Sequence, residues 1–340
     1  MAHIIQTRTT RTNGHGLTDR ELAKTRSQFY AQIRDFFNQA NYVETETPIL
    51  STHLIPESAI EIFKTRLNHP HRESDELYLC PSPEVYMKTL IAEGIGDCYQ
   101  ITKVFRNAEH YSQRHLAEFT MLEWYGMNQN YLDNIQTTQS LLKTLAPQAH
   151  PDTRHYFETF SEITMSDLFE QTVGFALDQC ETLEQFKAHA NAAGLNEYTE
   201  CSKTWEDLFE FIFVAHVERS IPSDRTVFVK DYPAQIPTTA KRTGNTYERW
   251  EFYMSGWEMA NCYTEECRYQ EMHDLFKKEE ALKNTMITPH TVNYDYLDIF
   301  KDTFPPCSGV AMGLDRLFAL FINAQSLDET SLFPFSEQLK

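Results

Sequence analysis

The sequence predicts an α+β fold in which helices flank a sheet built largely from hairpins. Three observations predict it. Apolar residues recur at helical spacing within residues 22–37, polar and apolar residues alternate along residues 118–125, and β-rich runs follow one another within residues 226–263. With 340 residues, 41% of them hydrophobic, the chain can bury one large core or two modest ones.

The first predicted element is a helix that follows a lead at residues 1–17, which we expect to be flexible. Thr18 and Glu21 suit a capping box, because Thr18 can accept the amide three residues on and Glu21 can reach back. The apolar side chains that follow at roughly helical spacing are Leu22, Phe29, Ile33, Phe36 and Phe37. Residues 42–50 then indicate a strand broken by Pro48, which is typical of an edge strand.

A second helix follows a short predicted strand at residues 77–80. We expect Ser82 to be its N-cap and Pro83 to take the first helical position, where the missing N–H does no harm. Glu84 in the first turn complements the helix dipole, so the spacing alone favours a structural role for it.

A hairpin with a basic loop is predicted at residues 104–125. Arg106 suits an α-phosphate, because its planar guanidinium offers two parallel donors and stays charged. Phe119 can stack on a purine ring, and Arg114 and His115 can reach further phosphates. Taken singly, these residues fit an ordinary hairpin with a polar loop equally well.

The two faces of the returning strand carry different chemistry. Side chains alternate in direction along a strand. One face carries Phe119, Met121, Glu123 and Tyr125, and the other carries Thr120, Leu122 and Trp124. We expect one face to pack in the core and the other to hold a ligand.

Residues 126–225 form a predicted insertion that is mostly helical and carries no motif. Its amphipathic candidates are residues 131–145, 181–193 and 205–219. Two further strands are predicted at residues 248–263, with Glu258 on the second and Glu265 just beyond it. Their odd spacing places these carboxylates on opposite faces of a straight strand, so spacing alone does not bring them together.

The last predicted element runs from a glycine-containing strand into an apolar helix at residues 307–317. Glycine is scarce, 11 of 340 residues against a usual share of about 7%, so Gly309 and Gly313, four residues apart, indicate a backbone constraint. Such a segment lets a ligand approach the backbone and points helix amides at it. Arg316 can offer a second guanidinium to phosphate, although a tight turn with Asp315 and Arg316 on the surface is the alternative.

Three of these segments together resemble the motifs of class II aminoacyl-tRNA synthetases of the lysyl, aspartyl and asparaginyl type. The helix, strand and proline at residues 18–50 resemble motif 1, which builds the dimer interface. Phe-Arg-Asn, Arg-His and Glu-Phe-Thr-Met-Leu-Glu within residues 104–125 resemble motif 2, and residues 307–317 resemble motif 3. The resemblance implies a homodimer whose catalytic domain, residues 18–340, has a mixed, mainly antiparallel sheet flanked by helices.

The same resemblance implies a site that uses ATP and Mg²⁺, with Arg106 and Arg316 as catalytic residues that stabilise charge on the phosphates. The implied ATP-binding residues are Arg106, Asn107, Glu109, Arg114, His115, Phe119, Glu258, Met259, Gly313 and Arg316. The implied substrate-binding residues are Ser82, Pro83, Glu84, Tyr125, Glu265 and Ala311. Glu258 and Glu265 are the implied magnesium ligands, since carboxylates are hard ligands.

The closer resemblance is to the EpmA (PoxA/GenX) family, whose members are free-standing lysyl-synthetase-like domains that attach β-lysine to a lysine of translation elongation factor P. Ser-Pro-Glu at 82–84, Glu-Phe-Thr-Met-Leu-Glu-Trp-Tyr at 118–125 and Cys-Ser-Gly-Val-Ala at 307–311 fit it. The chain reaches its motif 1 helix by Thr18, which leaves no room for the OB-fold anticodon domain of the tRNA-charging enzymes.

The resemblance therefore implies ATP-dependent activation of lysine or (R)-β-lysine as an adenylate and its transfer to elongation factor P. Lysyl-tRNA synthetases have glycine where this chain has Ala311. A methyl group there would crowd an α-amine and tolerate a β-amine, a difference typically worth roughly 1–3 kcal/mol. Which lysine isomer is activated stays open.

The net charge and the composition limit the partners and the compartment that we expect for this protein. The net charge of −19 argues against tRNA as the acceptor, because nucleic-acid affinity rests on cationic contacts with phosphates. The N-terminus has no apolar signal segment and no run is long enough to cross a bilayer, so we expect a cytoplasmic protein. The cysteines lack a C-x-x-C pair, which favours packed, reduced thiols over a zinc site.

Two stretches depart from the family pattern within the hairpin loop. One residue is inserted at Ala108, which leaves open whether Glu109 replaces the family's carboxylate, and Leu116-Ala117 replaces Asn-Pro. These departures leave open a non-catalytic or altered-substrate paralogue. The same fold would also suit a truncated lysyl-tRNA synthetase-like enzyme or an asparagine-synthetase-like amidoligase.

Overall fold

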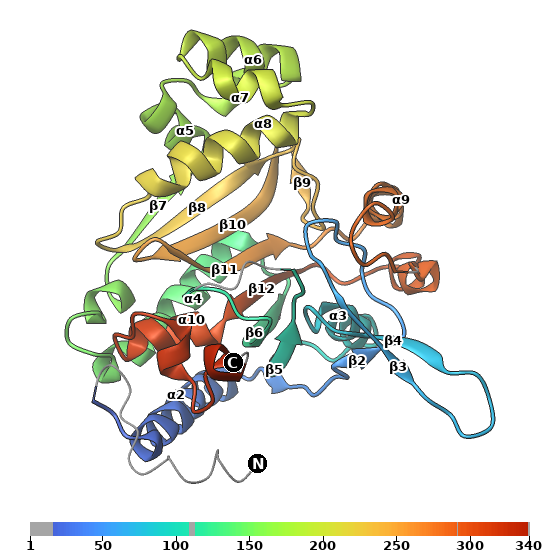
Figure 1. The fold of residues 1–340 in the computed structure, drawn as a ribbon, viewed down its shortest axis with the longest axis vertical. Coiled ribbons are helices and arrows are strands. Elements are labelled where there is room, and N and C mark those ends of the chain that lie inside the picture. Colours follow the sequence, from blue (N-terminus) through green and yellow to red (C-terminus); the bar gives the residue numbers. More distant parts are fainter. Residues whose placement is uncertain (1–15, 109–112, 291, 339–340) are drawn as a thin grey trace.

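The computed structural model describes residues 16–108, 113–290 and 292–338. A large sheet runs through it in the order β1-β5-β6-β12-β11-β10-β8-β7, with β9 paired to β10 (Figure 1). These strands are β1 Val43–Glu44, β5 Cys98–Phe105, β6 Glu118–Met127, β7 Phe160–Thr164, β8 Thr226–Pro233, β9 Arg242–Thr243, β10 Thr246–Met254, β11 Trp257–Thr264 and β12 Cys307–Gly313. The β1–β5 and β7–β8 pairs are parallel and the others antiparallel, which confirms the predicted mixed, mainly antiparallel sheet.

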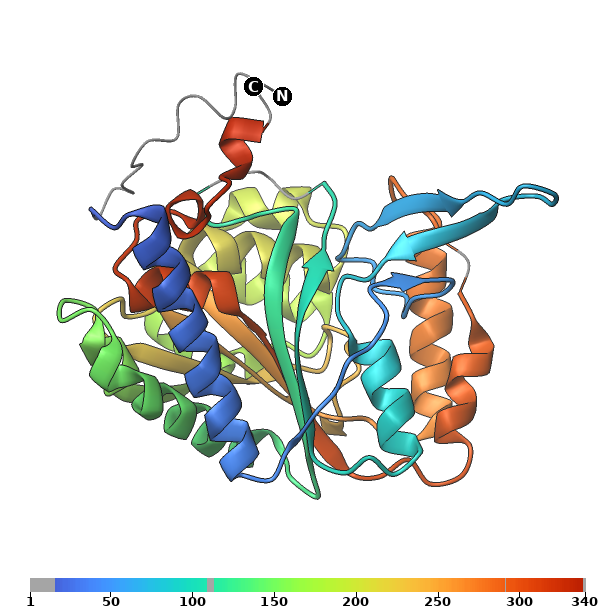
Figure 2. The same ribbon diagram turned by 90° about the horizontal axis from the view of Figure 1, so that it is seen from below.

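Helices cover both faces of the sheet. The main core lies between the sheet and three helices, α2 Asp19–Gln39, α4 Tyr131–Leu145 and α10 Leu314–Phe321. On the other side of β5 and β6 lie α3 Glu84–Ala92 and α9 Tyr269–Lys283 (Figure 2). The sheet therefore separates a dry core from the face that carries α3.

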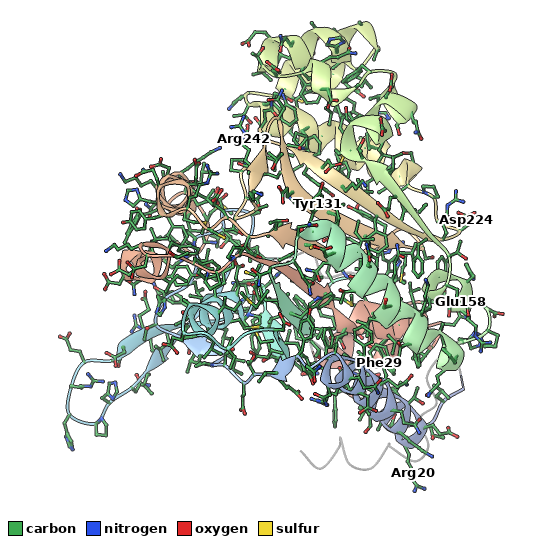
Figure 3. All side chains as sticks on the ribbon, turned by 180° about the vertical axis from the view of Figure 1, so that it is seen from behind. Arg20, Phe29, Tyr131, Glu158, Asp224 and Arg242 are labelled. Atoms are coloured by element: carbon green, nitrogen blue, oxygen red, sulfur yellow. The ribbon has the colours of Figure 1, made fainter. Side chains whose placement is uncertain are left out.

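The first helix forms as predicted. The Thr18 and Glu21 capping box is present, and Leu22, Phe29, Ile33 and Phe37 are buried. Arg20 projects from the outer end of α2, whereas Phe29 lies farther along the helix, within the body of the molecule (Figure 3). Most of the lead that we expected to be flexible, residues 1–15, lies outside the described residues.

A second, three-stranded sheet has the order β2-β4-β3, with bounds β2 Leu50–Ser51, β4 Asp75–Leu79 and β3 Phe63–Leu67. The strand predicted at residues 42–50 is thus two short strands, β1 and β2, on either side of Pro48. The β3–β4 hairpin projects from the body of the protein (Figures 1 and 2).

The later part of the predicted insertion, from Met165 to Ile221, builds a separate core at one end of the sheet (Figure 1), whereas α4 belongs to the main core. After α4 and β7 come α5 Met165–Val173, α6 Leu183–Ala192, α7 Asn196–Cys201 and α8 Trp205–Ile212, with a π-helical turn at Phe213–Val217. The remaining short elements are 3₁₀ turns at Ala146–Gln148, Arg154–Phe157, Leu177–Gln179, Glu218–Ser220, Tyr294–Phe300 and Leu327–Thr330, and α11 Phe335–Gln338. Stacked rings of Phe169, Phe209 and Trp205 hold the helices together.

All seven cysteines are free, and Cys201 is the exposed one. Within the described ranges, no helix is both long and apolar enough to cross a bilayer.

Candidate active site

One face of strand β12 is nearly bare of side chains. Gly309, Ala311 and Gly313 point to that face, while the two residues between them are buried in the main core. In the sheet, Ala311 lies opposite Glu123 on one side and Asn261 on the other. The alternation leaves a floor of small residues on which a ligand can lie.

Gly309 is glycine for a steric reason. A Cβ atom there would lie 2.4 Å from Cε1 of Tyr125 and 2.6 Å from Oε1 of Glu265, so any side chain would push these two groups apart. At Gly313, by contrast, a Cβ atom would come no closer than 3.8 Å to another residue. Its protein neighbours do not demand glycine, which leaves space beside the start of α10.

A buried ion-pair cluster lies at one end of this floor. Nζ of Lys88, whose side chain is 1% exposed, lies 2.5 Å from Oε1 of Glu84 and 2.7 Å from Oε2 of Glu265. Lys88 follows Glu84 by one helical turn on α3, and Glu265 directly follows β11. The structure thus brings together two of the predicted substrate-binding residues, joined by a lysine.

Glu123 lies beside this cluster and is 2% exposed. It accepts hydrogen bonds from the hydroxyls of Ser82 and Tyr125, each at 2.7 Å. Ser82 also accepts the amide N–H of Glu84 at 3.0 Å. The predicted substrate-binding Ser82 and Tyr125 therefore share a buried carboxylate.

The start of α3 differs by one residue from the prediction. The helix begins at Glu84 and Pro83 is the N-cap, rather than Ser82 as N-cap with Pro83 as first helical residue. The carbonyl of Pro83 accepts the first helical bonds, from Tyr86 and Met87. Ser82 lies one residue outside, where its hydroxyl still accepts the amide of Glu84 and reaches Glu123.

Burial governs the ionisation of this pocket. Burial raises the pKa of Glu123 to about 8, and the nearby charge of Glu84 adds to this rise. The hydrogen bonds that Glu123 accepts from Ser82 and Tyr125 act in the opposite direction. Burial also raises the pKa of Glu265 to about 7, against the opposing charge of Lys88. For Lys88, burial disfavours the charge, but Glu265 and Glu84 outweigh it and hold the pKa above its usual value. Three carboxyl groups share one lysine, so the pocket favours an added cation or protons.

Arg106 lies at the other end of the site, just after β5. Its backbone N–H donates to the carbonyl of Ala117 at 3.0 Å, and its guanidinium carbon lies 5.5 Å from the centroid of the Phe119 ring. Its Nε is buried and has no hydrogen-bond partner among the described residues. A buried, unpaired guanidinium N–H beside an aromatic ring suits an anionic group attached to a flat base.

The loop after Arg106 is held by its backbone. Asn107 donates its N–H to the carbonyl of Glu61 at 2.8 Å and its side-chain amide to that of Ile62 at 3.3 Å. Ala108, the inserted residue, has a φ of 54°, a left-handed conformation that side chains disfavour. Its N–H donates to Oδ1 of Asn107 at 2.8 Å. The predicted ATP contact Glu109 lies outside the described residues.

Arg316, on the first turn of α10, contacts two other segments of the site. Its Nε donates to the carbonyl of Arg114 at 3.1 Å, its Nη1 to that of Glu258 at 2.7 Å, and its Nη2 lies 3.2 Å from Nδ1 of His115. The guanidinium of Arg114 turns outward, to the carbonyl of Gly256. Both loop residues that were predicted to reach phosphates contact Arg316. His115 does so through its ring, and Arg114 through its backbone carbonyl.

Glu258 and Glu265 have different neighbours. A register shift in the β10–β11 pairing turns Glu258 toward Glu251 and Arg316, whereas Glu265 pairs with Lys88. Burial and the charge of Glu251 raise the pKa of Glu258 to about 7, against Arg316 and Arg106. Met259, predicted to bind ATP, has its side chain in the main core, so only its backbone is near Gly313. Within the described residues, no three His, Cys, Asp or Glu side chains are arranged so that they could hold a metal ion by themselves.

An ion pair between the half-buried Arg26 and the buried Asp315 links segments near the two ends of the chain to the site. Nη1 of Arg26 on α2 donates to Oδ1 of Asp315 at 2.7 Å, and Oδ2 of Asp315 accepts the N–H of Thr120 at 2.6 Å. Asp315 precedes Arg316, and Thr120 follows Phe119. The predicted surface alternative for Asp315 is therefore wrong, and this carboxylate fixes the spacing between Arg316 and Phe119.

Three residues of the site were not predicted from the sequence. Lys88 had an available signal, since residues four apart on a helix lie on one face. A sequence signal was also available for Glu123, because Glu123 shares a strand face with Tyr125. Glu57, on the loop between β2 and β3, had none, because only tertiary contacts bring that loop to the site.

Comparison with known proteins agrees with this geometry. The family model of class II tRNA synthetases (D, K and N) matches residues 15–337. An elongation factor P–(R)-β-lysine ligase from Vibrio atlanticus is 31% identical over 317 residues, covering 92% of this chain and 95% of the relative. The ligase of the same name from Vibrio vulnificus is 30% identical, covering 93% and 96%. A homolog of this ligase from Aquifex aeolicus is 31% identical, covering 88% and 94%. The chain therefore belongs to the class II tRNA synthetase family of the aspartyl, lysyl and asparaginyl type, in the group of the elongation factor P–(R)-β-lysine ligases.

Proposed function

We propose that the protein activates lysine or (R)-β-lysine with ATP, forming an aminoacyl adenylate and pyrophosphate, and transfers the aminoacyl group to a lysine side chain of elongation factor P. The observation that carries the proposal is the acidic pocket of Glu84, Glu123 and Glu265, which lies on the same strand face as Arg106. One end of the site suits amines and the other suits a nucleotide phosphate. The names of the relatives support the same reaction and acceptor.

The acidic pocket of Glu84, Glu123 and Glu265, called the amine pocket from here on, matches a substrate with two amino groups. Glu123 and Glu265 have raised pKa values because they are buried with too few cations. An entering ammonium group supplies the missing charge and donates hydrogen bonds to the carboxylate oxygens. A neutral side chain would leave these carboxyl groups unpaired, so the pocket selects against ordinary apolar amino acids.

The nucleotide end would act by positioning and charge stabilisation rather than through a protein nucleophile. Arg106 would bind the α-phosphate and Phe119 would stack on the base. Arg316 and His115 would face the outer phosphates. The carboxylate of Glu258, crowded by Glu251, fits a magnesium ion held jointly by protein and phosphate oxygens, as Mg²⁺ needs only one or two carboxylates. Magnesium there would neutralise phosphate charge.

Glu265 is better suited to the substrate amine than to the metal. Its carboxylate pairs with Lys88 and is packed against Gly309, whereas Arg316 is a charged neighbour of Glu258. We therefore divide the two roles that the family resemblance assigns jointly to this pair, with Glu258 for magnesium and Glu265 for an amine.

Ala311 is placed to tune which lysine isomer is used. Its methyl group lies on the small-residue floor, opposite Glu123. A methyl group that crowds an α-amine changes discrimination by roughly 1–3 kcal/mol. We propose that Ala311 biases the enzyme toward (R)-β-lysine, and that Ala311→Gly improves the use of α-lysine relative to it.

We also propose a homodimer that works in the cytoplasm, where elongation factor P serves translation. The edge strand β1 and the turn after it expose Val43, Ile49 and Leu50. A groove of about 800 Å³ lies next to this edge, between residues 44–49 and residues 100–103 of β5. An exposed apolar edge of this kind is suited to a second copy of the chain.

The test is pyrophosphate exchange with ATP and each of α-lysine, (R)-β-lysine and (S)-β-lysine, followed by mass spectrometry of elongation factor P. The proposal expects exchange with a lysine isomer and a mass increase on elongation factor P. Charging of tRNA without modification of elongation factor P would favour a truncated lysyl-tRNA synthetase-like enzyme. Absence of both ATP binding and exchange would favour a non-catalytic paralogue.

A further inference from the structure

The loop from β2 to β3 reaches the site and is anchored from one side by α9. Nζ of Lys283, a buried lysine, donates to the carbonyl oxygens of Glu57, at 3.3 Å, and Ile60. A carboxylate oxygen of Glu279 accepts the N–H of Ser58 at 2.7 Å. These bonds fix the backbone from Glu57 to Ile60.

The same loop is anchored from the other side beside Arg106. The carbonyl of Glu61 accepts the N–H of Asn107 at 2.8 Å. The carboxylate of Glu61 accepts the N–H groups of Ile287 and Thr288, at 2.8 and 3.0 Å. The loop is therefore a fixed wall of the site.

The charged side chain that this loop contributes to the site is the carboxylate of Glu57. Its carboxylate makes no hydrogen bond to any described residue, and its charged neighbours are Glu84, Arg106, Glu279 and Lys88. Glu84 and Lys88 belong to the amine pocket, whereas Arg106 belongs to the nucleotide end of the site. Burial and then Glu84 raise the pKa of Glu57 to about 7, against Arg106. Nothing in the activation of the amino acid uses this group.

We propose that Glu57 binds the lysine ammonium of the acceptor protein and takes its proton in the transfer step. This inference rests on the proposed function. In an aminoacyl adenylate, the reacting carbonyl carbon lies between the amine-bearing chain and the α-phosphate. Because the charged neighbours of Glu57 belong to both ends of the site, and its loop is bonded to Asn107 next to Arg106, we place its carboxylate beside that carbon. A carboxylate without a hydrogen-bond partner among the described residues suits an incoming primary ammonium group.

Atoms and charges balance in this transfer. The acceptor ammonium gives one proton to the Glu57 carboxylate, and the free amine nitrogen attacks the carbonyl carbon of the adenylate. The new C–N bond forms as the bond from this carbon to the phosphate oxygen breaks. AMP leaves with the electron pair of that bond, and the second proton of the nitrogen passes to water. An amide, AMP and protonated Glu57 result.

The test uses the full chain and separates the two half-reactions. Glu57→Gln is compared with Glu76→Gln, an exposed glutamate on β4 that pairs with Lys64 far from the site. Three rates are measured with the lysine isomer that the wild type prefers: pyrophosphate exchange, capture of the adenylate by hydroxylamine, and transfer to elongation factor P. Hydroxylamine is largely a free base at neutral pH and needs no proton acceptor.

We expect Glu57→Gln to leave exchange and hydroxylamine capture at the wild-type rate and to slow transfer to elongation factor P on the order of 100-fold at neutral pH. Glu76→Gln should match the wild type in all three rates. Glu57→Asp should recover part of the transfer rate. Parallel loss of exchange and transfer in Glu57→Gln would assign this residue to the amino acid or ATP and overturn the proposal, as would normal transfer. A wild type that shows no exchange would overturn the proposed function and this inference with it.

Discussion

Lys88 and Glu265 form an ion pair of 2.7 Å in the interior of the protein, with exposed side-chain fractions of only 1% and 2%. A buried pair is costly to form and more costly to break, because removal of one partner leaves a charge without compensation. Lys88 also holds Glu84. It therefore keeps two carboxylates of the amine pocket in place before any substrate arrives.

Lys88→Met should destabilise the protein by about 3–5 kcal/mol at alkaline pH, where the buried Glu265 carboxylate would be ionised and unpaired. The loss should shrink in mildly acidic solution, since burial raises the pKa of Glu265 to about 7 and its carboxyl group can then take up a proton. Denaturant unfolding at two pH values measures both effects. The double variant Lys88→Met, Glu265→Gln should recover part of the stability, and equal stability of the single variant and the wild type at alkaline pH would contradict this role.

Glu123→Gln should change how stability depends on pH. The folded-state pKa of Glu123 is raised to about 8 from an ordinary value of 4.5, so the folded protein retains a proton that the unfolded chain has lost. This contribution to stability is fully present below pH 4.5 and is lost as the pH rises toward 8. The stability of the wild type relative to Glu123→Gln should therefore fall as the pH increases through this range. Unfolding curves for both proteins across it provide the measurement, and a constant difference would refute the assignment.

Lysine should weaken the same pH dependence. An ammonium group bound at Glu123 favours the ionised carboxylate and lowers its pKa. The wild type with saturating lysine should thus lose less stability on going to alkaline pH than the free protein. Glu123→Gln provides the control, because it has no proton at this position to release.

Gly309→Ala and Gly313→Ala each add one methyl group to the same face of β12, so their effects can be compared directly. At Gly309 the added methyl group would overlap Tyr125 and Glu265, whereas at Gly313 it meets ordinary contact distances. Gly309→Ala should therefore raise the KM for lysine and lower the melting temperature without ligands. Gly313→Ala should keep the melting temperature of the wild type and raise only the KM for ATP. Equal melting temperatures for the two variants would show that Gly309 has no steric role.

Arg106→Lys should reduce the exchange rate on the order of 100-fold or more, because a lysine lacks the planar pair of donors that a phosphate uses in the transition state. The matched change Arg114→Lys should have a much smaller effect, since the Arg114 side chain is turned outward to Gly256. Steady-state exchange with varied ATP separates kcat from KM. Similar losses in both variants would mean that Arg106 has no special position.

Alternation in a strand explains why part of the site could be predicted. The prediction that the two faces of residues 118–125 differ is confirmed, with Leu122 and Trp124 in the main core and Glu123 and Tyr125 buried at the pocket. A strand of this length has little freedom in where its side chains point once one face is apolar. The capped first helix followed from a similarly local pattern, whereas the mixed sheet followed from the family resemblance.

Other parts depend on contacts that no local pattern encodes. The bulge at Met259, next to Glu258 on β11, and the position of Glu265 after the end of β11 decide where these carboxylates lie. Spacing in an ideal strand predicts neither. Glu57 reaches the site because Lys283 and Glu279, more than 200 positions along the chain, hold its loop. The start of α3 differed by one residue because Pro83 and Ser82 compete for the cap.

The most direct test of the central claim is reconstitution of the complete reaction from purified protein, ATP, Mg²⁺, (R)-β-lysine and elongation factor P. We predict AMP formation that depends on (R)-β-lysine, and an elongation factor P whose mass increases by one lysyl residue on a single lysine side chain. The same mixture with Arg106→Lys should yield far less product. An unmodified elongation factor P, in a reaction where the protein binds ATP and each lysine isomer has been supplied, would contradict the proposed function.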